Sequence, residues 1–210
     1  MRIGLDEAYC TTNVDPDVTA TIMRAADVLR ERGAETQPVE LPDSRPMVDG
    51  WVACCCVDTA LAHAPYYEER RADYGSVLAA LIEQGLEWGG IEHAAIQIER
   101  AKFAGAVAAL FTEVEAYLSP SLPYPTPTNA FTFMEALGEE EGAVERLISF
   151  TAPQDMAGIP AMCLPGGFDA DGVPLGFQIV GPRLGEEQVL RAGHAYQEDT
   201  DWHARLPLLA

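Results

Sequence analysis

Lysine is nearly absent from this chain of 210 residues, since Lys102 is the only one among 13 basic side chains. Acidic residues number 33, and the formal net charge is −20. A chain this acidic repels phosphate backbones and anionic lipid headgroups over the whole Debye length. We therefore expect neither nucleic acid nor a membrane among its partners.

Long apolar runs are also missing, so the sequence holds no segment able to cross a bilayer. The first six residues contain an apolar run of at most three residues before an acid, which is too short for a secretory signal. These absences predict a globular, cytoplasmic protein. A chain of this length is expected to form one domain over residues 1–210.

The five cysteines do not suggest a disulfide framework, because their number is odd and their spacing irregular. Three are consecutive, Cys54 to Cys56, and on a helix they would fan out by about 100° each instead of converging on one metal. We expect buried, reduced thiols, no metal site and no cofactor. Cys163 lies in an apolar run and is also expected in the core, where burial raises a thiol pKa.

The remaining pattern predicts an α/β fold. Strands are expected at residues 2–5 and 35–41, and the helix between them is framed by Asp15-Pro16-Asp17 and Gly33. This β-α-β unit favours a parallel strand pair. The segment 47–114 is helical, with breaks at Gly75 and at residues 89–90.

The longest predicted helix carries a stripe that we expect to pack closely against a neighbour, because most of its side chains are small. Its members are Ile91, Ala94, Ile98, Ala101, Gly105 and Ala108.

The C-terminal part returns to strands. We expect a strand at 116–118, a rigid proline-rich loop at 119–127, a helix at 139–150, a turn-rich connector at 151–160, strands at 161–164 and 175–180, and a helix after Gly185. Loops that follow strands are where α/β proteins place their pockets.

An ordered set of segments resembles the C-terminal half of the amidase signature family. They are residues 2–5, 14–18, 119–123, 150–153, 158–161, 167–168 and 171–182. The likeness extends from Met1 to Leu209. It implies part of an α/β/α sandwich with a mixed β-sheet, and hydrolysis of amide bonds, sometimes of esters or carbamates, without a cofactor.

The resemblance also implies a chemistry whose residues this chain lacks. The family uses a nucleophilic Ser, a second Ser after a cis peptide, and a Lys whose lowered pKa lets it act as base. Those groups and the Gly-Ser-rich oxyanion loop lie in the family's N-terminal half. None of the five serines here (Ser44, Ser76, Ser119, Ser121 and Ser149) lies in such a loop, and Lys102 is on the flank of a helix. The sequence therefore assigns no catalytic residue.

The leading hypothesis is an amidase component that contributes fold and one pocket wall and becomes catalytic toward a small amide only when complemented. From their positions in loops after predicted strands, Tyr124, Phe131, Phe133 and Phe168 are the candidate substrate-binding residues. The expected partner is an N-terminal amidase half, or a second copy that pairs through an exposed sheet edge.

Two other hypotheses stay open. The chain could be a stand-alone, non-catalytic binding or assembly module that reuses the fold. It could also be an autonomous hydrolase with a new site around Ser121 or Cys163, although the sequence places no base beside either residue.

Overall fold

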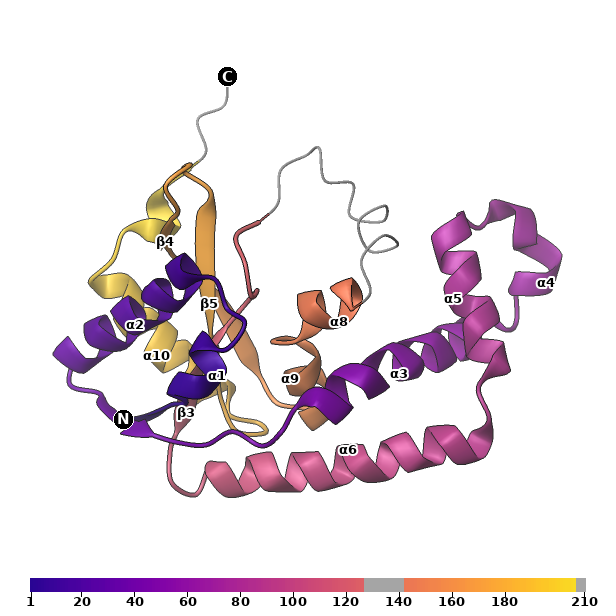
Figure 1. Cartoon of the computed structure of the whole chain (residues 1–210), viewed down its shortest axis with the longest axis horizontal. Helices are drawn as coiled ribbons and strands as arrows, with labels where there is room; N and C mark the ends of the chain where they lie inside the picture. The colour runs from indigo at the N-terminus through magenta and orange to yellow at the C-terminus, as the bar shows by residue number, and fades with distance from the viewer. Residues whose placement is uncertain (127–141, 207–210) are drawn as a thin grey trace.

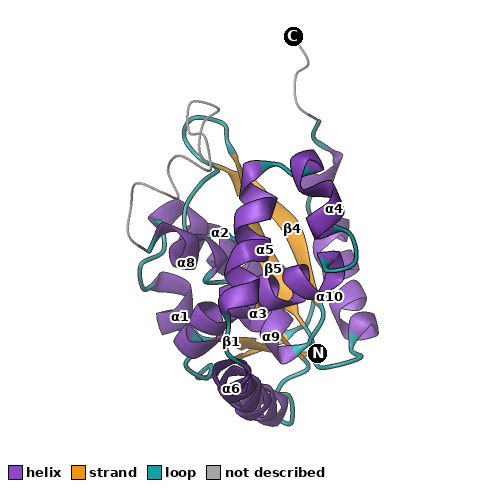
Figure 2. Ribbon diagram, turned by 90° about the vertical axis from the view of Figure 1, so that its right-hand side faces the viewer, coloured by secondary structure: helices purple, strands orange, loops and turns teal. Residues whose placement is uncertain are grey.

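A five-stranded mixed sheet lies at the centre of the computed structural model, which describes residues 1–126 and 142–206 (Figures 1 and 2). The strands are β1 Arg2–Leu5, β2 Glu35–Pro38, β3 Ala116–Pro120, β4 Ala161–Phe168 and β5 Pro174–Val180. Their order is β2-β1-β3-β5-β4. β1 pairs in parallel with β2 and β3, whereas β5 is antiparallel to both β3 and β4.

Helices surround this sheet. They are α1 Glu7–Thr11, α2 Pro16–Glu31, α3 Arg45–His63, α4 Tyr67–Arg70, α5 Ser76–Glu87, α6 Gly90–Leu110, α8 Ala143–Ile148, α9 Ala152–Ala157 and α10 Glu186–Glu198, with short 3-10 turns at Arg71–Asp73 and Trp202–Ala204. None of the described helices is long and apolar enough to cross a membrane.

The sheet has a helix layer on each face, which confirms the predicted α/β class. α2 and α10 cover one face, where Ile22, Phe177 and Tyr196 are part of the main core (Figure 1). On the other side, α3, α6 and α9 share a second core. The alternation of strand side chains explains this, because Leu118 points to the first layer while its neighbour Tyr117 stacks on Phe111, just after α6.

Local sequence signals set the first β-α-β unit as expected. The Asp15 carboxylate accepts a hydrogen bond from the backbone N–H of Asp17 at 2.9 Å, and Pro16 occupies the first helical position. Gly33, at a φ of 89°, turns the chain after α2 into β2. β2 ends at Pro38, three residues earlier than predicted.

A helical arm extends away from the sheet in Figure 1, built from the end of α3, then α4, α5 and the start of α6. Ala60, Tyr67 and Ile82 form its small core. α3 and α5 approach so closely that a Cβ on Gly85 would overlap the carbonyl oxygen of Cys56. Glycine is therefore required at this helix crossing.

Two sequence expectations about the helices are wrong. The connector at 151–160 contains α9, because a proline is tolerated in a first helical turn and Gly158, at a φ of 68°, closes the helix. The stripe on α6 is largely exposed rather than packed, with Ile91 at 88% and Ile98 at 58% exposure. The opposite face, which carries Phe103 and Val107, faces the core.

Candidate functional site

The main candidate cavity opens where two neighbouring parallel strands, β1 and β3, end. It has a volume of about 790 Å³ and is lined by Tyr9, Thr12, Asn13, Val14, Asp15, Ser44, Pro123, Tyr124, Arg146, Ser149 and Phe150. Residues 9–15 follow β1, and residues 123–124 follow β3. The carboxyl ends of adjacent parallel strands are where α/β proteins form ligand pockets.

Aromatic rings form much of this cavity. The Arg146 guanidinium lies 5.0 Å from the centroid of the Tyr124 ring, within cation–π range. Tyr9 meets Phe150 edge to face, with 5.0 Å between ring centroids. The backbone N–H of Asp15 donates to the carbonyl of Pro123 at 2.8 Å, which ties the two loops together. Such walls, with one Arg and one Asp among the described lining residues, suit a largely uncharged group.

Two tyrosines, Tyr9 in the cavity wall and Tyr117 near it, are neutral at physiological pH. Burial raises the pKa of Tyr9 well above its usual range, although the Ser44 and Ser119 hydroxyls oppose this. Burial also raises the pKa of Tyr117. The Ser119 hydroxyl is completely buried and donates to the carbonyl of Pro120 at 3.0 Å. Ser119 therefore contributes to local structure, and no base activates it among the described residues.

The lysine that the family's chemistry needs has no counterpart at this cavity. Lys102 lies exposed on α6, where its Nζ pairs with Glu99 at 2.6 Å. Ser121 borders a smaller cavity of about 60 Å³, also lined by Tyr124, Pro174 and Gly176. The described residues thus bring no serine together with a lysine.

The cysteines confirm one expectation and contradict another. Cys54 and Cys56 are buried, as predicted, whereas Cys55 between them is only half-buried. Cys10 is buried, with its pKa raised to about 12 by desolvation. Cys163 is exposed, so its placement in the core was wrong. Desolvation by neighbours still raises the Cys163 pKa, so nothing activates this thiol. Among the residues that the structure describes, no His, Cys, Asp and Glu cluster could hold a metal ion.

The exposure of Cys163 follows from its place on an edge strand. β4 is the outermost strand and pairs only with β5. Met162 and Leu164 point toward Gly193 of α10, whereas Ala161 and Cys163 point to the other side and are exposed. In the described part of the chain, Ala161 and Cys163 thus remain exposed, whereas the end of β4 is partly covered by the turn at Trp202–Ala204, where Phe168 meets Trp202.

The predicted substrate-binding residues do not gather at one place. Tyr124 lines the main cavity, whereas Phe168, 40% exposed, meets Trp202 edge on at 5.9 Å between centroids. Phe131 and Phe133 lie outside the described residues. The sequence reasoning missed Tyr9 and Arg146. Tyr9 could have been found, because it directly follows the first strand, but nothing near Arg146 in the sequence indicates its approach to Tyr124.

The fold and the cavity therefore define an α/β protein with a pocket at the carboxyl ends of its parallel strands. Residues 1–190 match the amidase family. The putative amidase AmiD of Mycobacterium tuberculosis is 35% identical over 206 residues, covering 98% of this chain and 43% of AmiD. An amidase of Pseudomonas putida is 29% identical over 218 residues, covering 100% of this chain and 45% of that protein. The chain belongs to the amidase family.

Solved structures agree in fold. The 6-aminohexanoate cyclic dimer hydrolase superposes with a TM-score of 0.81 at 23% identity, covering 99% of this chain and 46% of that chain. At this identity the likeness shows a shared fold alone. The chain spans less than half the length of these relatives, so they contain a further portion with no counterpart here.

Proposed function

We propose that this chain is the C-terminal half of an amide-hydrolysing enzyme and becomes catalytic only with a complementary half that supplies the two serines and the lysine. One observation carries the proposal: the chain matches the amidase family over residues 1–190, yet its only lysine is exposed and paired with Glu99. A serine nucleophile needs a positioned base, and an exposed lysine paired with Glu99 does not supply one. We expect this enzyme to work in the cytoplasm without a cofactor.

In the assembled enzyme this half supplies one wall of the acyl pocket. The cavity beside Tyr124 has the size and aromatic lining of a small-molecule site. We retain Phe131, Phe133 and Phe168 as further candidates for this wall, and a small carboxylic amide as the substrate.

The complementary half docks on β4. β4 is an edge strand, so outward-facing N–H and C=O groups in its first half can pair with another strand, whereas Pro165 has no N–H and its carbonyl accepts from the Tyr196 hydroxyl at 3.3 Å. The bare side with Ala161 and Cys163 would be covered by the same partner.

The test is complementation. The N-terminal half of the M. tuberculosis relative, produced separately and also joined ahead of this chain, is mixed with benzamide and ammonia release is measured. We expect release from the joined protein or the pair and from neither half alone. A stable joined protein without release would overturn the proposal.

The open edge of β4 also favours a second candidate, a non-catalytic module that assembles through this strand with its own copy. Sedimentation of the chain alone separates the two. A dimer that persists when the complementary half is added would favour the module.

A further inference from the structure

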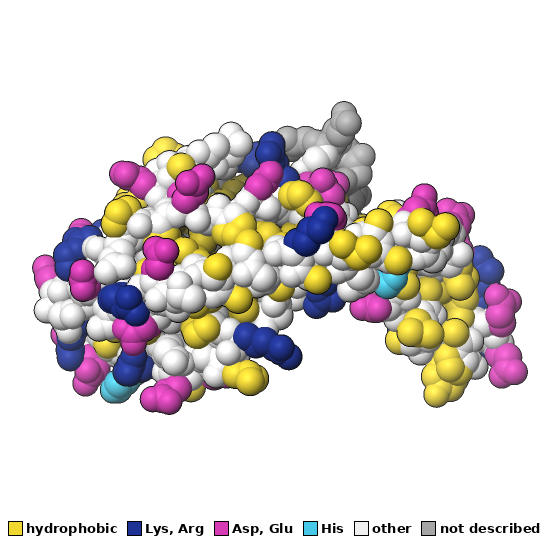
Figure 3. Space-filling model, turned by 90° about the horizontal axis from the view of Figure 1, so that it is seen from below, with side chains coloured by type: hydrophobic (Ala, Val, Ile, Leu, Met, Phe, Trp, Pro, Cys, Tyr) yellow, Lys and Arg dark blue, Asp and Glu magenta, His cyan; other side chains and the backbone are white. Residues whose placement is uncertain are grey.

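A second, unassigned surface is a groove on the side of the molecule where α6 lies. It has a volume of about 690 Å³ and is lined by Gln97, Arg100, Ala101, Ala104, Ala108, Phe111, Met156, Ala157, Gly158, Ile159, Pro182 and Arg183. Its two sides are α6 and the segments that follow α9 and β5. Figure 3 looks at the molecule from below Figure 1, where α6 lies, and yellow apolar atoms are spread over this face.

The charge of the groove differs from that of the chain. Its lining has two arginines and no acid, although acids outnumber basic residues 33 to 13 overall. Arg100 is held in place, because its Nε donates to the carbonyl of Met156 at 2.8 Å. Arg183 is exposed and makes no ion pair within the described residues. A carboxylate presented by a ligand would therefore be favoured here.

Leu184, beside Arg183, is an exposed apolar side chain in a tight turn. It has a φ of 61° and is 84% exposed. The turn runs from Pro182 to Gly185, whose backbone N–H donates to the Pro182 carbonyl at 2.8 Å, and it holds the Leu184 side chain outward. Ile98, one helical turn before Ala101 of the lining and on the same face of α6, is 58% exposed. Large apolar side chains beside an apolar groove are typical of a docking surface.

The groove ends close to β4. Ile159 lines it, and Ala161 and Cys163, in the first half of the strand that begins two residues later, are exposed. A partner that pairs with the start of β4 would therefore lie close to the groove. The relatives have more than half of their length beyond the part that matches this chain, so such a partner is large enough.

We propose that this groove binds a segment of the complementary amidase half that carries apolar side chains and at least one carboxylate. The proposal rests on the proposed function. A second copy of this chain is the poorer occupant, because each copy carries a net charge of −20 and the two repel.

Two variants test the groove with the separately produced N-terminal half of the M. tuberculosis relative as probe. Arg183→Glu should weaken association by about tenfold or more, as for an interface residue of high energetic weight. Arg30→Glu, the same charge change on α2, should leave it unchanged. Leu184→Gly should raise the thermal midpoint of the chain alone, because glycine accepts the positive φ, and yet weaken association.

If the separate halves do not associate, the same variants are made in the joined protein. Arg183→Glu should then lower its thermal midpoint more than that of the isolated chain. An equal change in thermal midpoint in the joined protein and in the isolated chain would overturn the groove proposal, as would unchanged association of the separate halves. Self-association of the isolated chain that Arg183→Glu abolishes would overturn it as well. A joined protein that shows the expected shifts but releases no ammonia would overturn the proposed function and leave the groove assignment standing.

Discussion

Two buried glutamines differ in what their amides contact. Gln178 is 2% exposed, and its Nε2 donates to the carbonyls of Pro120 and Phe150, both at 2.6 Å. Gln154 is 3% exposed and lies beside the Tyr117 hydroxyl, but neither of its side-chain polar atoms meets a hydrogen-bond partner among the described residues. Gln178 thus fixes the loop after β3, whereas Gln154 carries a desolvation penalty.

Replacing each glutamine with methionine should change stability in opposite directions. Gln154→Met removes an unpaired buried amide and should raise the free energy of unfolding by about 1–3 kcal/mol. Gln178→Met removes one of the two donors to the Pro120 carbonyl and the side-chain donor to the Phe150 carbonyl, and should lower the free energy of unfolding by a similar amount. Urea unfolding of both variants measures this. A destabilised Gln154→Met variant would show that the amide is satisfied, for example by a buried water.

At the scale of elements, the sequence predicted most of the framework correctly. The strands at 2–5, 116–118 and 175–180 and the helix after Asp15 were found because caps, glycines and alternation are local signals. For α6, the sequence did not predict which face of the helix the rest of the chain covers. A stripe of small side chains indicates close packing, but the sequence does not say whether its neighbour belongs to this chain.

The candidate site was predictable only in part. Tyr124 was found from its loop after β3, while Arg146 reaches the same cavity from a segment 22 residues later through tertiary packing. The prediction that Cys163 is buried was wrong for a similar reason. An apolar run predicts a strand buried on both faces, and the run cannot show that β4 forms an open edge.

At the crossing of α3 and α5, even one added methyl group should lower the stability of the arm. Gly85→Ala would drive a methyl group into the backbone of Cys56 and should cost about 1–3 kcal/mol. Gly105→Ala is the matched control on α6, where the added Cβ meets nothing within 4 Å, and it should stabilise by roughly 0.5–1 kcal/mol. Urea unfolding monitored by circular dichroism distinguishes them. Equal effects would mean that α5 does not approach α3 this closely.

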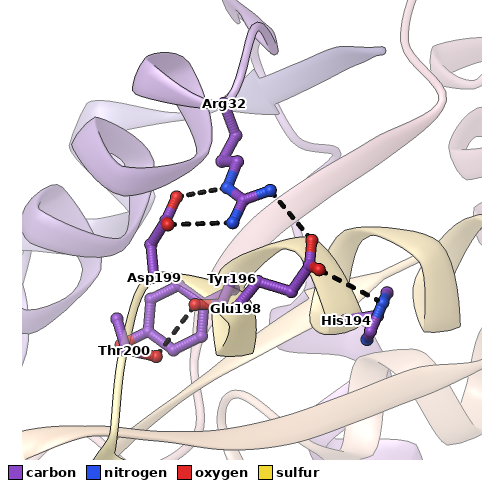
Figure 4. A network of polar contacts seen from close by, with 6 residues as sticks. All are labelled: Arg32, His194, Tyr196, Glu198, Asp199 and Thr200. Carbon is purple, nitrogen blue, oxygen red and sulfur yellow. Dashed lines mark hydrogen bonds and ion pairs between the residues drawn. The ribbon is translucent and has the colours of Figure 1, made fainter.

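At the scale of the whole molecule, an ion network ties α2 to the end of α10 (Figure 4). Arg32, just after α2, donates from Nη1 to Glu198 and from Nη2 to Asp199, both at 2.8 Å. The hydrogen bonds from Arg32 hold the Asp199 pKa below its usual value. A carboxylate with a lowered pKa adds stability above its usual pKa of about 4, and that contribution is lost as the pH falls through the lowered value.

Arg32→Gln should therefore be less stable than the natural chain at pH 6, and the difference should shrink below about pH 4, near the usual carboxylate pKa. Arg183→Gln is the control, with no such pH dependence, because Arg183 is exposed and makes no ion pair within the described residues. Thermal midpoints between pH 3 and 7 provide the measurement. A difference that is constant with pH would show that Asp199 is not the partner that matters.

The molecule as a whole has the family's fold, a pocket with aromatic walls, a free edge on β4 and no described pairing of serine with lysine. These are the features on which the proposal of an amidase component rests. The α6 groove reaches to Ile159, two residues before β4, so a single large partner that pairs with β4 would lie close to the groove as well.

The most direct test of this account is labelling with a fluorophosphonate probe, which reacts with activated serines. The folded chain alone, the N-terminal half of the M. tuberculosis relative alone, and the two together are treated and separated by mass. We predict that label appears on the N-terminal half and only when this chain is present. Stoichiometric labelling of this chain by itself would contradict the account and establish a serine nucleophile of its own.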